Sequence, residues 1–439
     1  MKNGVVRSLI HSLAYSFIGF QTAYLSTCFP SIFWNTAVLR VESGLEDNAN
    51  SDYKKIAKAV CDITSKGIPV YPIDINKSQY AFEPDVENNA IIYGMKALNG
   101  VNGERIAEII ANRPYSGLDD FLEKTKANKT VMLSLIKSGA FDQFGERKDI
   151  MNKYLGSISG LKSKVNLQNM ASLINYNIVP VEHKFQKSLF NYNKSLKSRK
   201  FTMDDRHYNF YQKYFDVDDL SIDGDVFSID EKKWKKMYDK GMEPFKTYLK
   251  DHQQEMVDKL NEAILNESIL SNASGSYSSW EMESMGFYYH EHEMLPIDRR
   301  LYNVVKYNSL PETAEVEKMF NDYPIYKLNT IMGTVIAKDD VKSTISLLTV
   351  DSGVVNVKFN RDTYAYYNKR ISEVQPDGTK KCIEESWFQK GTLLMVTGVR
   401  RNDVFFAKKY KNTPAELVYR VTDIDHDTGQ CTRITERVA

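Results

Sequence analysis

The chain has 439 residues, of which 42% are hydrophobic and 26% are charged. This length suits about three domains, and this composition excludes a disordered or fibrous chain. Lysine plus arginine number 58 and aspartate plus glutamate 57, giving a formal net charge of +1. This sum hides separate blocks, because residues 126–200 hold 14 basic and 4 acidic residues, whereas residues 201–230 hold 2 and 8. A basic block of this kind suits a phosphate backbone.

The first forty residues resemble a membrane anchor at first sight. No charged residue occurs from Ser8 to Leu39, and Lys2 and Arg7 precede that stretch. Polar side chains and Pro30 interrupt the stretch, however, and a lipid-spanning helix would have to bury them. The pattern predicts a buried helix over residues 8–27, a second helix starting near Pro30, and no membrane association. A membrane or secreted protein is the alternative.

The remaining elements follow from hydrophobic spacing. We expect an amphipathic helix at residues 51–66, extended chain at 67–76, and short helices broken by glycines at 91–150. Residues 151–200 read as a mobile connector and residues 201–270 as polar, aromatic and helical toward their end. A period of two over residues 326–409 marks five strands with a long excursion after the third, which predicts a small OB-like barrel. The fold class is therefore multidomain α+β, mainly helical in its first two-thirds.

Two glycine-rich turns join helices in a pattern typical of nucleic-acid binding. One covers residues 98–103 and the other residues 138–145. Glycines let a backbone approach phosphate closely, and amides at a helix N-terminus bind it without reading base sequence. An ordinary helical corner is the alternative. The candidate DNA-binding residues are Gly100, Val101, Asn102, Gly103, Arg105, Lys137, Ser138, Gly139, Ala140 and Arg147.

Few residues suggest a metal site. The four cysteines form no CxxC pair and lie near no histidine at ligand spacing, which argues against zinc and for a reducing cytoplasm. His290 and His292 read as surface groups. The acidic runs read as solvated turns, so no metal is expected on this chain. These runs lie at residues 216–219, 223–225 and 423–427.

The motifs together resemble the C-terminal part of the alpha subunit of bacterial DNA polymerase III, a C-family polymerase. The fingers segment of that family is similar to residues 11–33, its Pro-Asp-Ile-Asn-x-Ser turn to residues 72–78, and its tandem helix-hairpin-helix region to residues 93–101 and 138–142. The stretch before its OB domain is similar to residues 283–292. The implied domains are the end of the fingers (1–87), the hairpins (88–150), a basic connector (151–200), a helical insert (201–320), an OB-like domain (321–415) and a tail (416–439).

The resemblance also implies partners. His11 and Ser12 would lie near the incoming nucleotide. Gln186, Ser188, Leu189 and Phe190 stand where the family carries a sliding-clamp peptide. The catalytic aspartates and their Mg²⁺ belong to a palm domain upstream, so a second, palm-containing chain is expected as a partner, as in a split or phage-like polymerase. Departures are Val6–Ile10 in place of the family's Gly-Phe-Asn-Lys-Ser and Asn102 in place of a glycine.

Two functions remain open at this stage. The chain is either the DNA- and clamp-binding half of a replicative DNA polymerase or a stand-alone DNA- and clamp-binding adaptor without catalysis. In the barrel, aromatic and cationic side chains are candidates for holding a single strand, although core packing of the aromatic residues is the plainer alternative. These candidates are Phe359, Tyr364, Trp387, Arg400, Arg401, Phe405 and Lys409.

Overall fold

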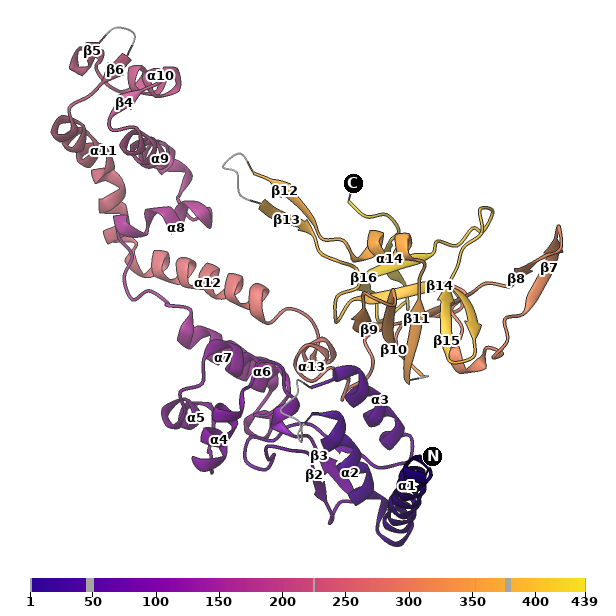
Figure 1. Cartoon of the computed structure of the whole chain (residues 1–439). Helices are drawn as coiled ribbons and strands as arrows, with labels where there is room; N and C mark the ends of the chain where they lie inside the picture. The colour runs from indigo at the N-terminus through magenta and orange to yellow at the C-terminus, as the bar shows by residue number, and fades with distance from the viewer. Residues whose placement is uncertain (1, 45–50, 224–225, 352, 376–379, 439) are drawn as a thin grey trace. The chain divides into compact units, whose positions relative to one another are not determined.

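The computed structural model describes residues 2–44, 51–223, 226–351, 353–375 and 380–438, with side chains from residue 9 onward in the first helix. The chain forms two compact units (Figure 1). Unit 1 joins Met1–Met151 to Gly275–Ala439, and unit 2 is Asn152–Ser274. Each unit is described separately below.

Unit 1 begins with two helices, α1 (Lys2–Cys28) and α2 (Ser31–Glu42), separated at Pro30 as expected. The expected burial of α1 is wrong, because its apolar side chains face solvent along its described length. Leu13 is 71% and Phe20 70% exposed. Only α2 contributes to the core, through Ile32 and Leu39. Among the described residues, no helix is long and apolar enough to cross a membrane.

The hairpin region follows α3 (Tyr53–Thr64), whose N-terminus is capped by Asp52. A small sheet of β1 (Val70–Tyr71), β2 (Glu83–Asp85) and β3 (Ala90–Ile92) leads into four short helices. Their apolar faces enclose Ile106, Phe121 and Leu135. The helices are α4 (Gly103–Ala111), α5 (Leu118–Lys124), α6 (Lys129–Lys137) and α7 (Arg147–Ile158).

The predicted barrel is confirmed, and it is closed. Its order is β11-β10-β9-β14-β15, and β15 pairs in parallel with β11 to complete the ring. Helix α14 (Arg361–Asn368) fills the connection after the third strand, which is the OB-like arrangement. Alternate residues fill the interior, including Val335, Leu347 and Val357. The strands are β9 (Asn329–Asp339), β10 (Thr344–Thr349), β11 (Gly353–Lys358), β14 (Leu393–Arg401) and β15 (Val404–Ala407).

Further strands surround the barrel. The expected tail is instead part of its sheet, because β16 (Val418–Ile424) pairs with β14 and β17 (Cys431–Ile434) pairs with β16. Two ribbons accompany the barrel, one of β7 (Val316–Phe320) and β8 (Tyr323–Tyr326), and one of β12 (Ile371–Val374) and β13 (Lys380–Glu384). Helix α13 (Tyr277–Met285) precedes them.

Unit 2 corrects the expectation of a mobile connector, because its residues share one apolar core. Helix α9 (Lys184–Ser198) packs against α11 (Glu231–Asp251), and Leu189 is fully buried between them. A Cβ on Gly241 would lie 2.6 Å from Leu189 Cδ2, so this glycine allows the close approach. The other elements are α8 (Met170–Asn175), α10 (Asp205–Tyr214), α12 (Gln253–Asn272), β4 (Thr202–Met203), β5 (Ser221–Asp223) and β6 (Val226–Ser228).

We predict that Leu189→Ala destabilises unit 2 by about 2–5 kcal/mol, the usual range for a buried leucine that leaves a cavity. Urea unfolding of the full chain, followed by hydrogen exchange at unit 2 amides, measures the loss. Val181→Ala is the matched control, because Val181 is 84% exposed and its loss should leave stability within about 0.5 kcal/mol. Equal stability of the two variants would contradict the buried position of Leu189.

Candidate nucleic-acid interface

In the first hairpin Gly100 and Asn102 are exposed, Gly103 is partly exposed, and Val101 is buried. Gly100 has φ +78°, a left-handed conformation that favours glycine, and Asn102 caps α4 by accepting a hydrogen bond from the Arg105 amide at 3.0 Å. Among the described residues, none accepts a hydrogen bond from the amides of Gly100 to Glu104. A run of unpaired amides before a helix is a site for an anion.

Cationic side chains border this run of amides. A Cβ on Gly100 would meet Thr130 Cγ2 at 2.9 Å, so the start of α6 lies beside the hairpin. Lys129 is exposed there, and so is Lys126. Arg105, expected to contact DNA, is half-buried and forms an ion pair with Glu108. Lys126 and Lys129 are not among the residues predicted from the sequence, although both belong to the basic block that begins at residue 126.

The backbone amides of the second hairpin, in contrast, are already hydrogen-bonded within the protein. Gly139 also has a left-handed backbone, with φ +85°. Its amides are used internally, however, because those of Ser138, Gly139 and Ala140 donate to carbonyls of α6 at 3.0 Å. The side chains of Lys137, Ser138 and Arg147 are buried. The second hairpin therefore offers neither amides nor these side chains to a phosphate.

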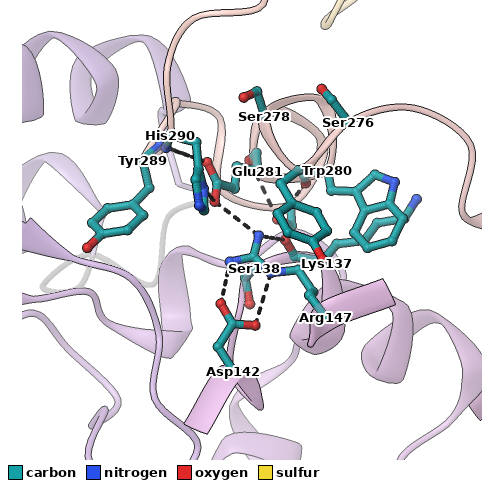
Figure 2. A network of polar contacts seen from close by, with 12 residues as sticks. Lys137, Ser138, Asp142, Arg147, Ser276, Ser278, Trp280, Glu281, Tyr289 and His290 are labelled. Carbon is teal, nitrogen blue, oxygen red and sulfur yellow. Dashed lines mark hydrogen bonds and ion pairs between the residues drawn. The ribbon is translucent and has the colours of Figure 1, made fainter. Parts of the chain in front are cut away.

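A buried network explains the position of Arg147 (Figure 2). Its guanidinium donates to both carboxylate oxygens of Asp142, at 2.6 and 3.0 Å, and to Glu281 Oε1 at 3.0 Å. Burial alone would lower the pKa of Arg147, but the hydrogen bonds and charges of Asp142 and Glu281 outweigh it and raise this pKa above its ordinary value. Tyr277 covers the guanidinium, with its ring centroid 5.0 Å from Arg147 Cζ.

Glu281 is fully buried and has no unused oxygen. Its Oε2 accepts hydrogen bonds from the amides of Tyr289 and His290, each at 2.9 Å. Its Oε1 shares a hydrogen bond of 2.6 Å with His290 Nδ1, in addition to the bond from Arg147. The second hairpin thus packs against α13 and the segment after it, and these contacts form a joint between the two parts of unit 1. Arg147, Lys137 and Ser138 are corrected from candidate DNA contacts to parts of this joint.

The side chains expected near a nucleotide or a clamp differ in exposure. His11 and Ser12 lie on the exposed surface of α1. Gln186 and Leu189 are buried in α9, where Gln186 Nε2 donates to the Gly241 carbonyl at 3.3 Å. Phe190 packs partly buried against the same core. The peptide is therefore helical and folded, in contrast to the flexible segment that was expected.

The expected single-strand contacts in the barrel are mostly core residues. Phe359 and Trp387 are buried in the barrel interior and its helical cover, and so are Tyr364 and Phe405. Arg400 is half-buried and donates to the Leu310 carbonyl at 2.8 Å. Arg401 is exposed. Side chains alternate between the two faces of a strand, so Phe405 points into the barrel while its neighbour Phe406 points outward.

A polar groove lies on the outer face of the first three barrel strands. Ser346 and Asn356 lie at its floor, joined by a hydrogen bond of 3.1 Å. Four lysines line it, one from α3 and three from the barrel. They are Lys54, Lys338, Lys342 and Lys358, and the carboxylates of Asp52 and Asp339 also line the groove. OB folds bind oligonucleotides on the corresponding face, so this groove replaces Phe359 and Trp387 as the candidate single-strand site.

The histidines and acidic runs show no metal cluster in the part of the chain that the structure describes. Asp225 of one run lies outside the described residues. His292, expected at the surface, is buried instead, and burial lowers its pKa to about 4. Its Nε2 donates to the Leu348 carbonyl at 2.9 Å. It therefore serves as a neutral structural group beside β10.

Comparisons with known proteins agree with this geometry. Residues 67–151 match the family model of the helix-hairpin-helix motif. The chain is 36% identical to "Probable DNA polymerase YorL" of Bacillus subtilis (strain 168) and to "DNA-directed DNA polymerase" of Bacillus phage SPbeta, in each case over 98% of this chain and 35% of the relative. It is 34% identical to "DNA polymerase III subunit alpha" of Thermus aquaticus over 32% of this chain and 11% of that protein.

The chain therefore spans about a third of the length of the first two relatives. The resemblance to the alpha subunit of bacterial DNA polymerase III is confirmed. Over nearly the whole chain the similarity extends to the DNA polymerases of Bacillus subtilis and Bacillus phage SPbeta named above.

We predict that Glu281→Gln lowers the stability of unit 1 by about 3 kcal/mol, because removing one partner of a buried ion pair leaves the other uncompensated. Chemical unfolding of the full chain measures this loss. Glu315→Gln is the matched control, since Glu315 pairs with Lys327 at 3.3 Å with both side chains more than half exposed. Its loss should cost less than about 1 kcal/mol. A Glu281→Gln variant as stable as the control would show that the network does not hold the joint.

Proposed function

We propose that this chain is the DNA-holding part of a DNA-directed DNA polymerase of the C family. The first hairpin would hold the phosphate backbone of duplex DNA, and the barrel groove would hold single-stranded template. The observation that carries the proposal is that no described residue accepts a hydrogen bond from the amides of Gly100 to Glu104, beside Lys129. Backbone amides and lysines contact phosphate, which suits an enzyme that has to bind every sequence it copies.

The catalytic carboxylates are expected in the part of the relatives that this chain does not span. We assign no chemical step to the described residues. We propose that the palm-containing part, on another chain or in a longer form of this one, covers the exposed apolar side of α1. The exposed apolar side chains of α1 include Leu13, Phe17 and Phe20. His11 and Ser12 are exposed on the same helix, and we still expect them near the nucleotide.

The second candidate is an adaptor that binds DNA and a sliding clamp without catalysis. Clamp binding through residues 186–190 remains a prediction. It would require α9 to open, because Leu189 is fully buried. Primer extension separates the two functions. Extension by the palm-containing part that is strictly dependent on this chain supports the polymerase, whereas extension unchanged without it supports the adaptor.

We predict that Gly100→Leu weakens duplex binding about tenfold or more on every sequence tested. A side chain at φ +78° is strained and displaces the unpaired amides. Fluorescence anisotropy with several unrelated duplexes at fixed salt measures the effect.

Gly117→Ala is the matched control. Gly117 precedes a helix as well, but its backbone is extended with φ 168° and a Cβ there meets nothing within 4 Å. Its affinity should be unchanged. A loss for Gly100→Leu that depends on base sequence would contradict backbone recognition.

We predict that the double variant Lys338→Ala/Lys358→Ala weakens binding of oligo(dT) and makes it less dependent on salt. Each lost phosphate contact should reduce the slope of log K against log salt by about 0.7. A salt titration of the full chain measures this slope. Lys66→Ala, an exposed lysine outside the groove, should leave it unchanged. A slope unaffected by the double variant would exclude the groove as the single-strand site.

A further inference from the structure

The outer face of the barrel continues from the groove across β15 and β14. Val404 lines the groove and stands in register with Asn356 on one side and with Arg401 on the other. Phe406 likewise stands in register with Lys358 of the groove. Residues in register on neighbouring strands share a face of the sheet and lie about 5 Å apart. Arg401 and Phe406 therefore belong to the same outer surface as the groove.

Aromatic rings border two cations on this surface. Arg401 Cζ lies 5.5 Å from the ring centroid of Phe406 and 5.1 Å from that of Tyr326, the last residue of β8. Lys408 Nζ lies 5.1 Å from the Tyr326 centroid and 4.9 Å from that of Tyr410. The Tyr410 hydroxyl accepts a hydrogen bond from the Tyr326 amide at 2.8 Å, which ties Tyr410 to the strand that carries Tyr326. Both cations thus lie beside one shared ring, that of Tyr326.

Arg401 and Lys408, the ring-held pair, keep their charges available. Their neighbours Arg400 and Lys409 each pair with a carboxylate, at 3.8 and 2.5 Å. Among the described residues, neither member of the ring-held pair forms an ion pair. A ring attracts a cation without neutralising it. A side chain that is already positioned also loses less conformational entropy when it binds a ligand. The ring-held pair is therefore prepared for an anion.

We infer that the ring-held pair binds two phosphates of a single strand that leaves the groove across β15 and β14. The inference rests on the proposed function, in which the groove holds that strand. The lysines of the groove outnumber its carboxylates, and the ring-held pair continues the same surface. A polynucleotide carries a negative charge at every step, so it matches this continuous row of cations better than an acidic peptide does. Contacts to phosphate do not depend on the bases.

A salt titration of oligo(dT) binding tests the ring-held pair. In the full chain, Arg401→Ala/Lys408→Ala should reduce the slope of log K against log salt by about 1.4, because each phosphate contact with a single strand contributes about 0.7. An abasic oligomer of the same length should show the same reduction, since it keeps every phosphate. A reduction seen with oligo(dT) alone would mean that the pair contacts bases, and it would overturn the inference.

Two control variants exclude other causes. Arg401→Lys/Lys408→Arg keeps both charges and should keep the wild-type slope. Lys327→Ala/Lys409→Ala removes as much positive charge as the test variant does, but from lysines that already pair with carboxylates, and it should keep the slope as well. An equal reduction in either control would reflect disturbance of the barrel or loss of net charge, and it would overturn the inference.

The outcomes separate this inference from the proposed function. If the wild type binds no oligomer, the barrel is not a single-strand site and both are wrong. If Lys338→Ala/Lys358→Ala lowers the slope but Arg401→Ala/Lys408→Ala does not, the groove stands and the inference is overturned. If only Arg401→Ala/Lys408→Ala lowers the slope, the ring-held pair stands and the groove is excluded.

Discussion

The ion pair of Arg147 with Glu281 is the constraint on which unit 1 depends. Burying an arginine and a glutamate is costly unless every charge and hydrogen-bonding atom is compensated. Here Asp142, two backbone amides and His290 complete the set. The two residues are separated by 134 positions. Their pairing therefore fixes the hairpin region to the segment that leads into the barrel, and it holds the two in a single relative position.

The same constraint gives the two hairpins different roles. Both contain a glycine with a left-handed backbone, Gly100 and Gly139. Around Gly139 the amides close on α6, and a Cβ would meet the Arg147 guanidinium at 2.4 Å, so this glycine serves the packing of the joint. Around Gly100 the amides have no acceptor among the described residues. The second hairpin thus contributes to the packing of unit 1, whereas the first is the phosphate site that we propose.

The sequence predicts well what depends on local periodicity. The break at Pro30, the helix α3 and the five barrel strands follow from spacing alone. It fails where burial depends on distant partners. Arg147 after a glycine turn reads as a DNA contact because nothing nearby in sequence shows Glu281. Residues 184–198 read as a polar connector because the residues that bury Leu189 come from α11, about fifty positions later. The apolar α1 reads as buried, whereas the described structure leaves it exposed.

The barrel shows why composition alone misplaces a binding surface. Phe405 and Phe406 are adjacent in sequence, yet one fills the core and the other faces outward beside Arg401. A small barrel needs aromatic residues to fill its interior, so most of its aromatic side chains point inward. What remains for a ligand is lysine and polar side chains on the outer face, with rings only where strand phase turns them outward. Recognition of a strand by such a surface would follow charge and stacking and not base sequence, which is what the proposed role in a polymerase requires.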